Sequence, residues 1–144
     1  MEKEPRLNPA EQQHSLVILI LAAGMGTRMK SRKAKVLHEI DGRPLIDHVC
    51  RTAQALDPKR IYVVVGYQAP AVEATVRKLL GDNLVSFVTQ AQQRGTGDAI
   101  IAARDALNNS DSTLLVLSGD VPCVRQVGAN QGAVHTIAYH LFDA

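Results

Sequence analysis

Three polar segments of this 144-residue sequence contain residues that could bind a nucleotide and a metal ion. The first, residues 21–29, contains Gly24 and Gly26, which let backbone N–H groups approach an anion closely. Arg28 within the segment and Lys35 after it add positive charge that suits a polyphosphate. A tight strand-to-helix turn with surface charges is the simpler alternative for this segment taken alone.

This glycine segment matches neither of two common phosphate-binding motifs. A Walker loop requires Gly-Lys-Ser/Thr, and no such sequence follows these glycines. A dinucleotide fingerprint would need glycine where Met29 stands. It would also need an acid after the second apolar run, where the sequence has Gly66-Tyr67. The segment therefore indicates phosphate binding of another kind.

The second polar segment, residues 90–99, contains three glutamines and two glycines. The amide of Gln90 can donate and accept hydrogen bonds at once, which suits the edge of a nucleobase. Gly95 and Thr96 stand where a helix is expected to begin, and they offer backbone N–H groups and an N-cap hydroxyl. An ordinary capped helix explains this segment equally well when it is taken alone.

The third polar segment is Ser118-Gly119-Asp120, which follows an apolar run and precedes Val121-Pro122. A carboxylate held by a turn at the end of a buried strand is well placed to bind Mg²⁺ beside phosphate oxygens. The alternative is an aspartate that only starts a turn before proline.

Four apolar runs predict strands, at residues 15–21, 61–65, 84–88 and 113–117. Between them, apolar residues at helical spacing predict three helices: one opened by Pro44 and stopped by Asp57-Pro58, one stopped by Gly81, and one entered through Gly95-Thr96. The alternation predicts an α/β fold, a Rossmann-like three-layer α/β/α sandwich with a mostly parallel sheet. All three polar segments follow strands, so they are expected at the sheet edge where such folds bind ligands.

The composition excludes several other classes of function. Sixteen basic and fourteen acidic residues give a net charge of +2, which favours neither nucleic acid nor a membrane surface as a partner. The longest apolar run, residues 16–23, is too short to span a bilayer. Cys50 and Cys123 lack metal-binding or redox spacing, which is typical of the reducing cytoplasm. The five histidines form no ligand spacing and are interpreted as structural or exposed.

Several elements together resemble the uridyltransferase half of the bacterial bifunctional N-acetylglucosamine-1-phosphate uridyltransferase / glucosamine-1-phosphate acetyltransferase family. The resemblance covers about Leu16 to Pro122. The elements that carry it are Ile20–Met29, Lys35-Val36-Leu37-His38, Gly42-Arg43-Pro44-Leu45, Gln90-Ala91-Gln92-Gln93 with Gly95-Thr96-Gly97, and Gly119-Asp120-Val121-Pro122.

The resemblance implies a Mg²⁺-dependent transfer from UTP to N-acetylglucosamine 1-phosphate, which gives UDP-N-acetylglucosamine and pyrophosphate. By position, it places Arg28 and Lys35 against phosphate charge and makes Asp120 a Mg²⁺ ligand. It places Leu21, Ala22, Ala23 and Gly24 along the nucleotide, and Gln90, Gly95 and Thr96 at the uracil and its surroundings. Ser118 and Gly119 are further candidate substrate-binding residues.

The chain departs from the family pattern in three ways. Ala34 stands where the family usually has proline, so the turn that aims Lys35 is expected to be looser. Residues 123–144 are expected to be a divergent or shortened segment, with a strand within 131–139, after a domain at 15–122 and a mobile tail at 1–14. The chain also stops before the family's sugar-binding region, its second Mg²⁺ ligand and its acetyltransferase part.

Three functions therefore remain open from the sequence: an impaired uridyltransferase, a non-catalytic nucleotide-binding fragment, and a related molybdenum-cofactor guanylyl- or cytidylyltransferase. The glutamine-rich segment argues against the third. Nothing in the sequence indicates a partner chain, and the oligomeric state is left open.

Overall fold

A five-stranded sheet forms the centre of the computed structural model, which describes residues 15–25, 32–92, 95–107, 112–121 and 137–140. The strand order is β5-β4-β1-β6-β7, and the first four strands are parallel while β7 runs antiparallel to β6. The strands are β1 (Ser15–Ala22), β4 (Arg60–Val65), β5 (Val85–Thr89), β6 (Ser112–Ser118) and β7 (Ile137–His140). The mostly parallel sheet that the sequence predicts is confirmed.

The central strand β1 is buried on both of its faces. Ile18 and Ile20 pack into one hydrophobic cluster, and Val17 and Leu19 pack into another on the opposite face. All four are at most 3% exposed. Burial on both faces explains why this strand is a continuous aliphatic run and does not alternate with polar residues.

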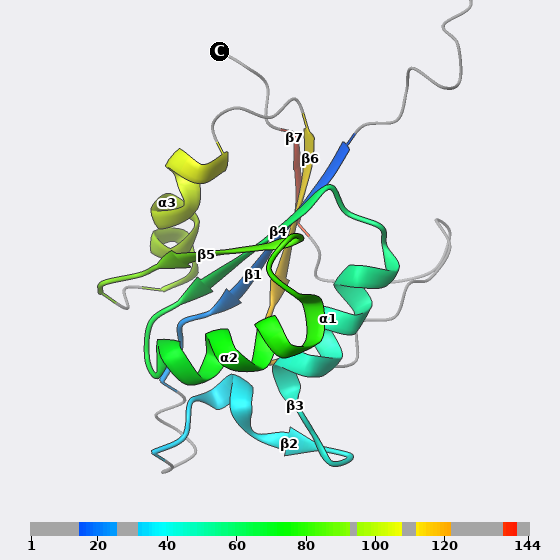
Figure 1. Ribbon diagram of the computed structural model, residues 1–144. Coiled ribbons are helices and arrows are strands. Elements are labelled where there is room, and N and C mark those ends of the chain that lie inside the picture. The colour runs from blue at the N-terminus through cyan, green and yellow to red at the C-terminus, as the bar shows by residue number, and fades with distance from the viewer. Residues whose placement is uncertain (1–14, 26–31, 93–94, 108–111, 122–136, 141–144) are drawn as a thin grey trace, which may run out of the picture.

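Helices cover both faces of the sheet, which gives the predicted three layers (Figure 1). One face packs against α1 (Leu45–Ala55) and α2 (Ala69–Leu80), and the other packs against α3 (Thr96–Leu107). The helix residues that enter the two clusters are Ile46, Val49, Cys50, Ala53, Val72, Val76, Ala99, Ala103 and Leu107. Among the described residues, no helix has the length and apolar character needed to cross a bilayer.

The long connection between β1 and α1 contains structure that the sequence analysis did not predict. A 3-10 turn, η3 (Lys35–Leu37), leads into a hairpin of β2 (Glu39–Ile40) and β3 (Arg43–Pro44). The hairpin turns at Asp41 and Gly42, with φ values of 53° and 74°. Two consecutive residues with positive φ are the signature of the tight turns that join antiparallel strands.

One predicted helix start is wrong by one position, and one predicted capping residue is wrong. Pro44 is extended and ends β3, so α1 begins at Leu45. The carbonyl oxygen of Gly95 accepts a hydrogen bond from the N–H of Ala99, at 3.2 Å, so Gly95 holds the capping position that the sequence assigned to Thr96. In the C-terminal segment, β7 overlaps the strand expected within 131–139. The expectations for residues 1–14 and 122–136 otherwise lie outside the described residues.

The end of β6 fits against β1 only because Gly119 has no side chain. Its N–H donates to the carbonyl oxygen of Leu21 at 2.9 Å. A Cβ atom at Gly119 would lie 2.8 Å from that oxygen and 3.1 Å from a Val36 methyl carbon. The close approach therefore fixes the relative positions of the ends of β1, β6 and η3.

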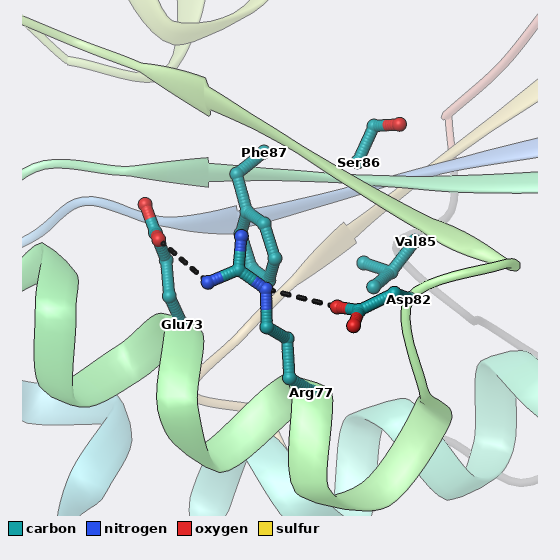
Figure 2. Close-up of a pocket in the computed structure, with 6 residues that line it drawn as sticks. All are labelled: Glu73, Arg77, Asp82, Val85, Ser86 and Phe87. Carbon is teal, nitrogen blue, oxygen red and sulfur yellow. Dashed lines mark hydrogen bonds and ion pairs between the residues drawn. The ribbon is translucent and has the colours of Figure 1, made fainter.

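A charged cluster joins α2 to β5, whose other side has no partner strand among the described residues. Arg77 donates to Glu73 at 3.3 Å and to Asp82 at 3.1 Å, and its guanidinium carbon lies 4.8 Å from the centre of the Phe87 ring. Figure 2 shows the guanidinium between the two carboxylates and against the ring. These residues line an open depression of about 710 Å³. Because two carboxylates already meet the charge of Arg77, the cluster is interpreted as stabilising.

We expect the substitution Gly119→Ala to lower the free energy of unfolding by about 1–3 kcal/mol, because the new methyl group must push back a backbone oxygen. Urea unfolding measures the loss. Gly97→Ala is the matched control, since nothing lies within 4 Å of a Cβ at that helical position. A similar loss in both variants would mean that the close approach is unimportant.

We expect Arg77→Met, which keeps the aliphatic stem, to lower the free energy of unfolding by about 1 kcal/mol. Chemical denaturation tests this, with Lys78→Met on the same helix as the control. The control is expected to change stability by less than about 0.5 kcal/mol. Equal effects would show that the ion pairs and the ring contact contribute nothing measurable.

Candidate functional site

The described parts of the three polar segments lie at one edge of the sheet. In the parallel register, Leu21 pairs with Ser118, and the strand β4 that ends at Val65 lies between β1 and β5. The segments that follow β1, β5 and β6 therefore leave the sheet at the same edge, as does the turn after β4. The sequence-based placement of the three segments is confirmed.

An ion pair lies at the centre of this edge. The ammonium of Lys35 is 2.6 Å from Oδ2 of Asp120, and the hydroxyl of Ser118 donates to Oδ1 of the same carboxylate. The side chain of Lys35 is 45% exposed and that of Asp120 is 23% exposed. The pair is thus accessible to a ligand, while both oxygens of the carboxylate are hydrogen-bonded.

The carboxyl group of Asp120 is held in its charged form. Partial burial raises its pKa. The hydrogen bonds from Lys35 and Ser118 and the charge of Lys35 together outweigh that effect, so the pKa lies below the ordinary 3.8. Asp120 therefore carries a full negative charge at neutral pH. An ionised carboxylate with an exposed neighbouring cation is suited to exchange that cation for a metal ion.

The backbone after β1 is the part of the first segment that a ligand can reach. Ala22 and Ala23 are buried, and Leu21 is half-buried with its carbonyl oxygen bonded to Gly119. Gly24 is exposed, and nothing lies within 4 Å of its Cβ position. Contacts from this segment to a ligand would come from backbone groups. Arg28, the other predicted cation, lies outside the described residues.

Gln90 has a fixed side chain just beyond β5. The residue is 6% exposed, and its N–H donates to the carbonyl oxygen of Val65 at 2.8 Å. Its amide Nε2 donates to Asp98 at 3.2 Å and to the Gly95 carbonyl oxygen at 3.5 Å. Thr96 is exposed beside this arrangement. The structure thus brings Gln90, Gly95 and Thr96 together, and it adds Asp98, for which the sequence analysis predicted no role.

The sequence analysis also missed the turn between β4 and α2. The side-chain hydroxyl of Tyr67 donates to the carbonyl oxygen of Arg32 at 2.6 Å. The N–H of Ala34 donates to the side-chain oxygen of Gln68, also at 2.6 Å. The sequence signal was a polar Tyr-Gln pair directly after the glycine at the end of a strand. Residues that follow a parallel strand are expected at the ligand edge.

A magnesium site at this edge would depend on ligands from a nucleotide. Among the described residues, no group of three or more His, Cys, Asp and Glu side chains could hold a metal ion. Asp120 nevertheless fits a Mg²⁺ ligand, because its Oδ2 already accepts a cation at 2.6 Å. Mg²⁺ in nucleotide sites commonly takes one or two carboxylates, with phosphate oxygens and water completing its coordination.

Similar proteins were found in both sequence and structure. The chain is 50% identical over 109 residues to the bifunctional protein GlmU of Koribacter versatilis, which covers 75% of this chain and 22% of that protein. It superimposes on UDP-glucose pyrophosphorylase complexed with UDP-glucose with a TM-score of 0.63 and 22% identity, covering 74% of this chain and 46% of that one. HddC from Yersinia pseudotuberculosis complexed with GMP-PN gives a TM-score of 0.59 and 26% identity, covering 74% and 50% of the two chains.

The chain spans 22% of the length of this GlmU relative, and its resemblance to the N-terminal part of the bifunctional uridyltransferase/acetyltransferase is confirmed by identities of 42–50%. The MobA-like NTP transferase domain matches residues 18–131. The parallel sheet and its ligand edge agree with these matches. The chain therefore belongs to the MobA-like NTP transferase domain family and is a nucleotidyltransferase-type domain similar to GlmU.

Proposed function

We propose that this chain binds UTP at the carboxyl edge of its sheet and transfers its uridylyl group to N-acetylglucosamine 1-phosphate. The observation that carries the proposal is the 2.6 Å contact between Lys35 and Asp120, at the sheet edge where Gly24 is also exposed. A cation, a carboxylate and exposed backbone at one edge are what a metal–nucleotide complex needs. The resemblance to the bifunctional uridyltransferase/acetyltransferase family supports the choice of base and sugar.

The phosphates of UTP would lie between the backbone of the first segment and the ion pair. Lys35 and Arg28 would neutralise phosphate charge, and Ser118 and Gly119 would border the same space. Mg²⁺ held by Asp120 and by phosphate oxygens would stabilise negative charge on the α-phosphate and on the leaving pyrophosphate. Leu21, Ala22, Ala23 and Gly24 would line the nucleotide with backbone groups.

The uracil base would lie against the segment after β5. Because Nε2 of Gln90 donates to Asp98 and Gly95, its oxygen Oε1 is the atom that remains for a ligand. That oxygen can accept a hydrogen bond from the N3–H of uracil. Gly95 and Thr96 would border the base.

The proposed reaction needs no general base from the protein. An oxygen of the sugar phosphate, already charged near pH 7, attacks the α-phosphorus of UTP. The bond from that phosphorus to the bridging oxygen breaks, and pyrophosphate leaves with the electron pair. Alignment and charge stabilisation are therefore the tasks of the site. These phosphorylated substrates are cytoplasmic metabolites, so the proposal places the chain in the cytoplasm.

Two other functions use the same edge. One is nucleotide binding without transfer, since the candidate residues that the structure describes at this edge are assigned to the nucleotide and the metal ion. The other is guanylyl or cytidylyl transfer, favoured by the MobA-like family description and by the GMP-PN complex of HddC. Competition between UTP, GTP and CTP for binding distinguishes guanylyl or cytidylyl transfer from the proposed uridylyl transfer.

We expect calorimetric titration with UTP and Mg²⁺ to show binding to the folded chain. Adding N-acetylglucosamine 1-phosphate then tests transfer, with detection of released pyrophosphate. Binding with release supports a working uridyltransferase, while binding without release supports a nucleotide-binding fragment. Tighter binding of GTP or CTP than of UTP would reject the proposed base selectivity.

We expect Asp120→Asn to weaken Mg²⁺-dependent UTP binding by about tenfold or more, since it removes the charged metal ligand. Binding without Mg²⁺ should not weaken, because the variant leaves no carboxylate unpaired when Lys35 contacts the nucleotide. Paired titrations with Mg²⁺ and with EDTA measure the difference. An equal loss under both conditions would show that Asp120 is only structural.

A further inference from the structure

The turn after β4 is bonded to the segment that carries Lys35. Two side chains of the turn make these bonds: Tyr67 donates to the carbonyl oxygen of Arg32, and Gln68 accepts from the N–H of Ala34. Both bonds measure 2.6 Å and join residues 34 or 35 positions apart in the chain. Neither belongs to a helix or to the sheet, so both depend on these two side chains.

Gln68 has a backbone conformation that normally favours glycine. Its φ of 53° and ψ of 38° are left-handed, a conformation that is sterically unfavourable for a residue with a Cβ atom. Gln68 precedes α2, yet its side chain makes no capping hydrogen bond to that helix. The amide oxygen bonds to Ala34 instead, and that contact offsets the backbone cost.

Ala34 is the residue through which this bond reaches Lys35. It is fully buried, with φ of −54° and ψ of 140°, and Lys35 begins η3 directly after it. Proline, which the resemblance places here, would fix φ near this value with its ring but would have no N–H. In this chain, a hydrogen bond from another turn restrains the same position.

We propose that Gln68 is a positioning residue, whose amide oxygen holds the Ala34 N–H and thereby keeps the Lys35 ammonium at Asp120, where the nucleotide phosphates bind. Displacements of about 1 Å are enough to weaken a charged site that must match its ligand. The part of the inference that concerns ligand binding rests on the proposed function. The part that concerns the position of Lys35 does not.

Gln68→Gly is the direct test, because glycine suits the left-handed backbone and removes only the side chain. Gln68→Glu keeps an acceptor oxygen for Ala34 and serves as the rescue. Asp57→Gly is the matched control: Asp57 has a nearly identical φ of 51°, but it precedes β4 at the opposite edge of the sheet.

The first readout is NMR of the nucleotide-free chain. In Gln68→Gly we expect faster hydrogen exchange at the Ala34 amide and loss of the ¹H–¹⁵N signal of the paired Lys35 ammonium, assigned by its absence from Lys35→Ala. Both signals should persist in Gln68→Glu and Asp57→Gly. Unchanged signals in Gln68→Gly would overturn the inference, whether or not the chain binds UTP.

The second readout is UTP affinity in a double-mutant cycle. Gln68→Gly should weaken binding about two- to tenfold, the range for one lost neutral hydrogen bond. In the Lys35→Ala background the same substitution should change affinity less than about twofold, because its effect runs through Lys35. An equal loss in both backgrounds would also overturn the inference. If the wild-type chain binds no nucleotide, the proposed function fails and the NMR result alone decides this inference.

Discussion

The parallel pairing of β1 with both β4 and β6 is the constraint on which the rest of the structure depends. Parallel neighbours force each connection to return over a face of the sheet, so helices cover both faces and β1 is buried between them. The same geometry sends the exits of the four parallel strands to one edge. The backbone at Gly24, the amide of Gln90 and the carboxylate of Asp120 come from separate parts of the chain, and this pairing brings them together.

Much of the fold could be predicted because its signals are local. Continuous aliphatic runs marked β1, β4, β5 and β6, and helical spacing marked α1, α2 and α3. The hairpin of β2 and β3 was missed because each strand has only two residues, too few for an alternating pattern. Its signal was Asp41-Gly42, a pair typical of hairpin turns. The antiparallel direction of β7 depends on pairing with β6, which no local pattern encodes.

The candidate site could be predicted in part, for a related reason. A topological rule places residues that follow strands at the ligand edge, so Gln90 and Asp120 were found from their position together with their side-chain chemistry. Lys35 and Asp120 were each expected near phosphate, but their mutual ion pair was not, since it joins η3 to the end of β6. The bonds of Tyr67 and Gln68 were missed because they connect distant side-chain and backbone groups through a left-handed residue. The sequence thus predicts which edge of the sheet binds the ligand, whereas the contacts that hold the site residues in place are seen only in the structure.

The ion pair also has a consequence for binding. Without a ligand, Lys35 and Asp120 neutralise each other, so neither charge is left unpaired at a partly buried edge. Under the proposed function, a metal–nucleotide complex supplies a cation for the carboxylate and an anion for the ammonium at the same time. Each new contact offsets the loss of the ion pair for one of the two side chains. A free metal ion would pair only with Asp120, and a metal-free nucleotide would pair only with Lys35. An edge built in this way favours the complex over either component, and it does so only while the backbone before Lys35 is held in place.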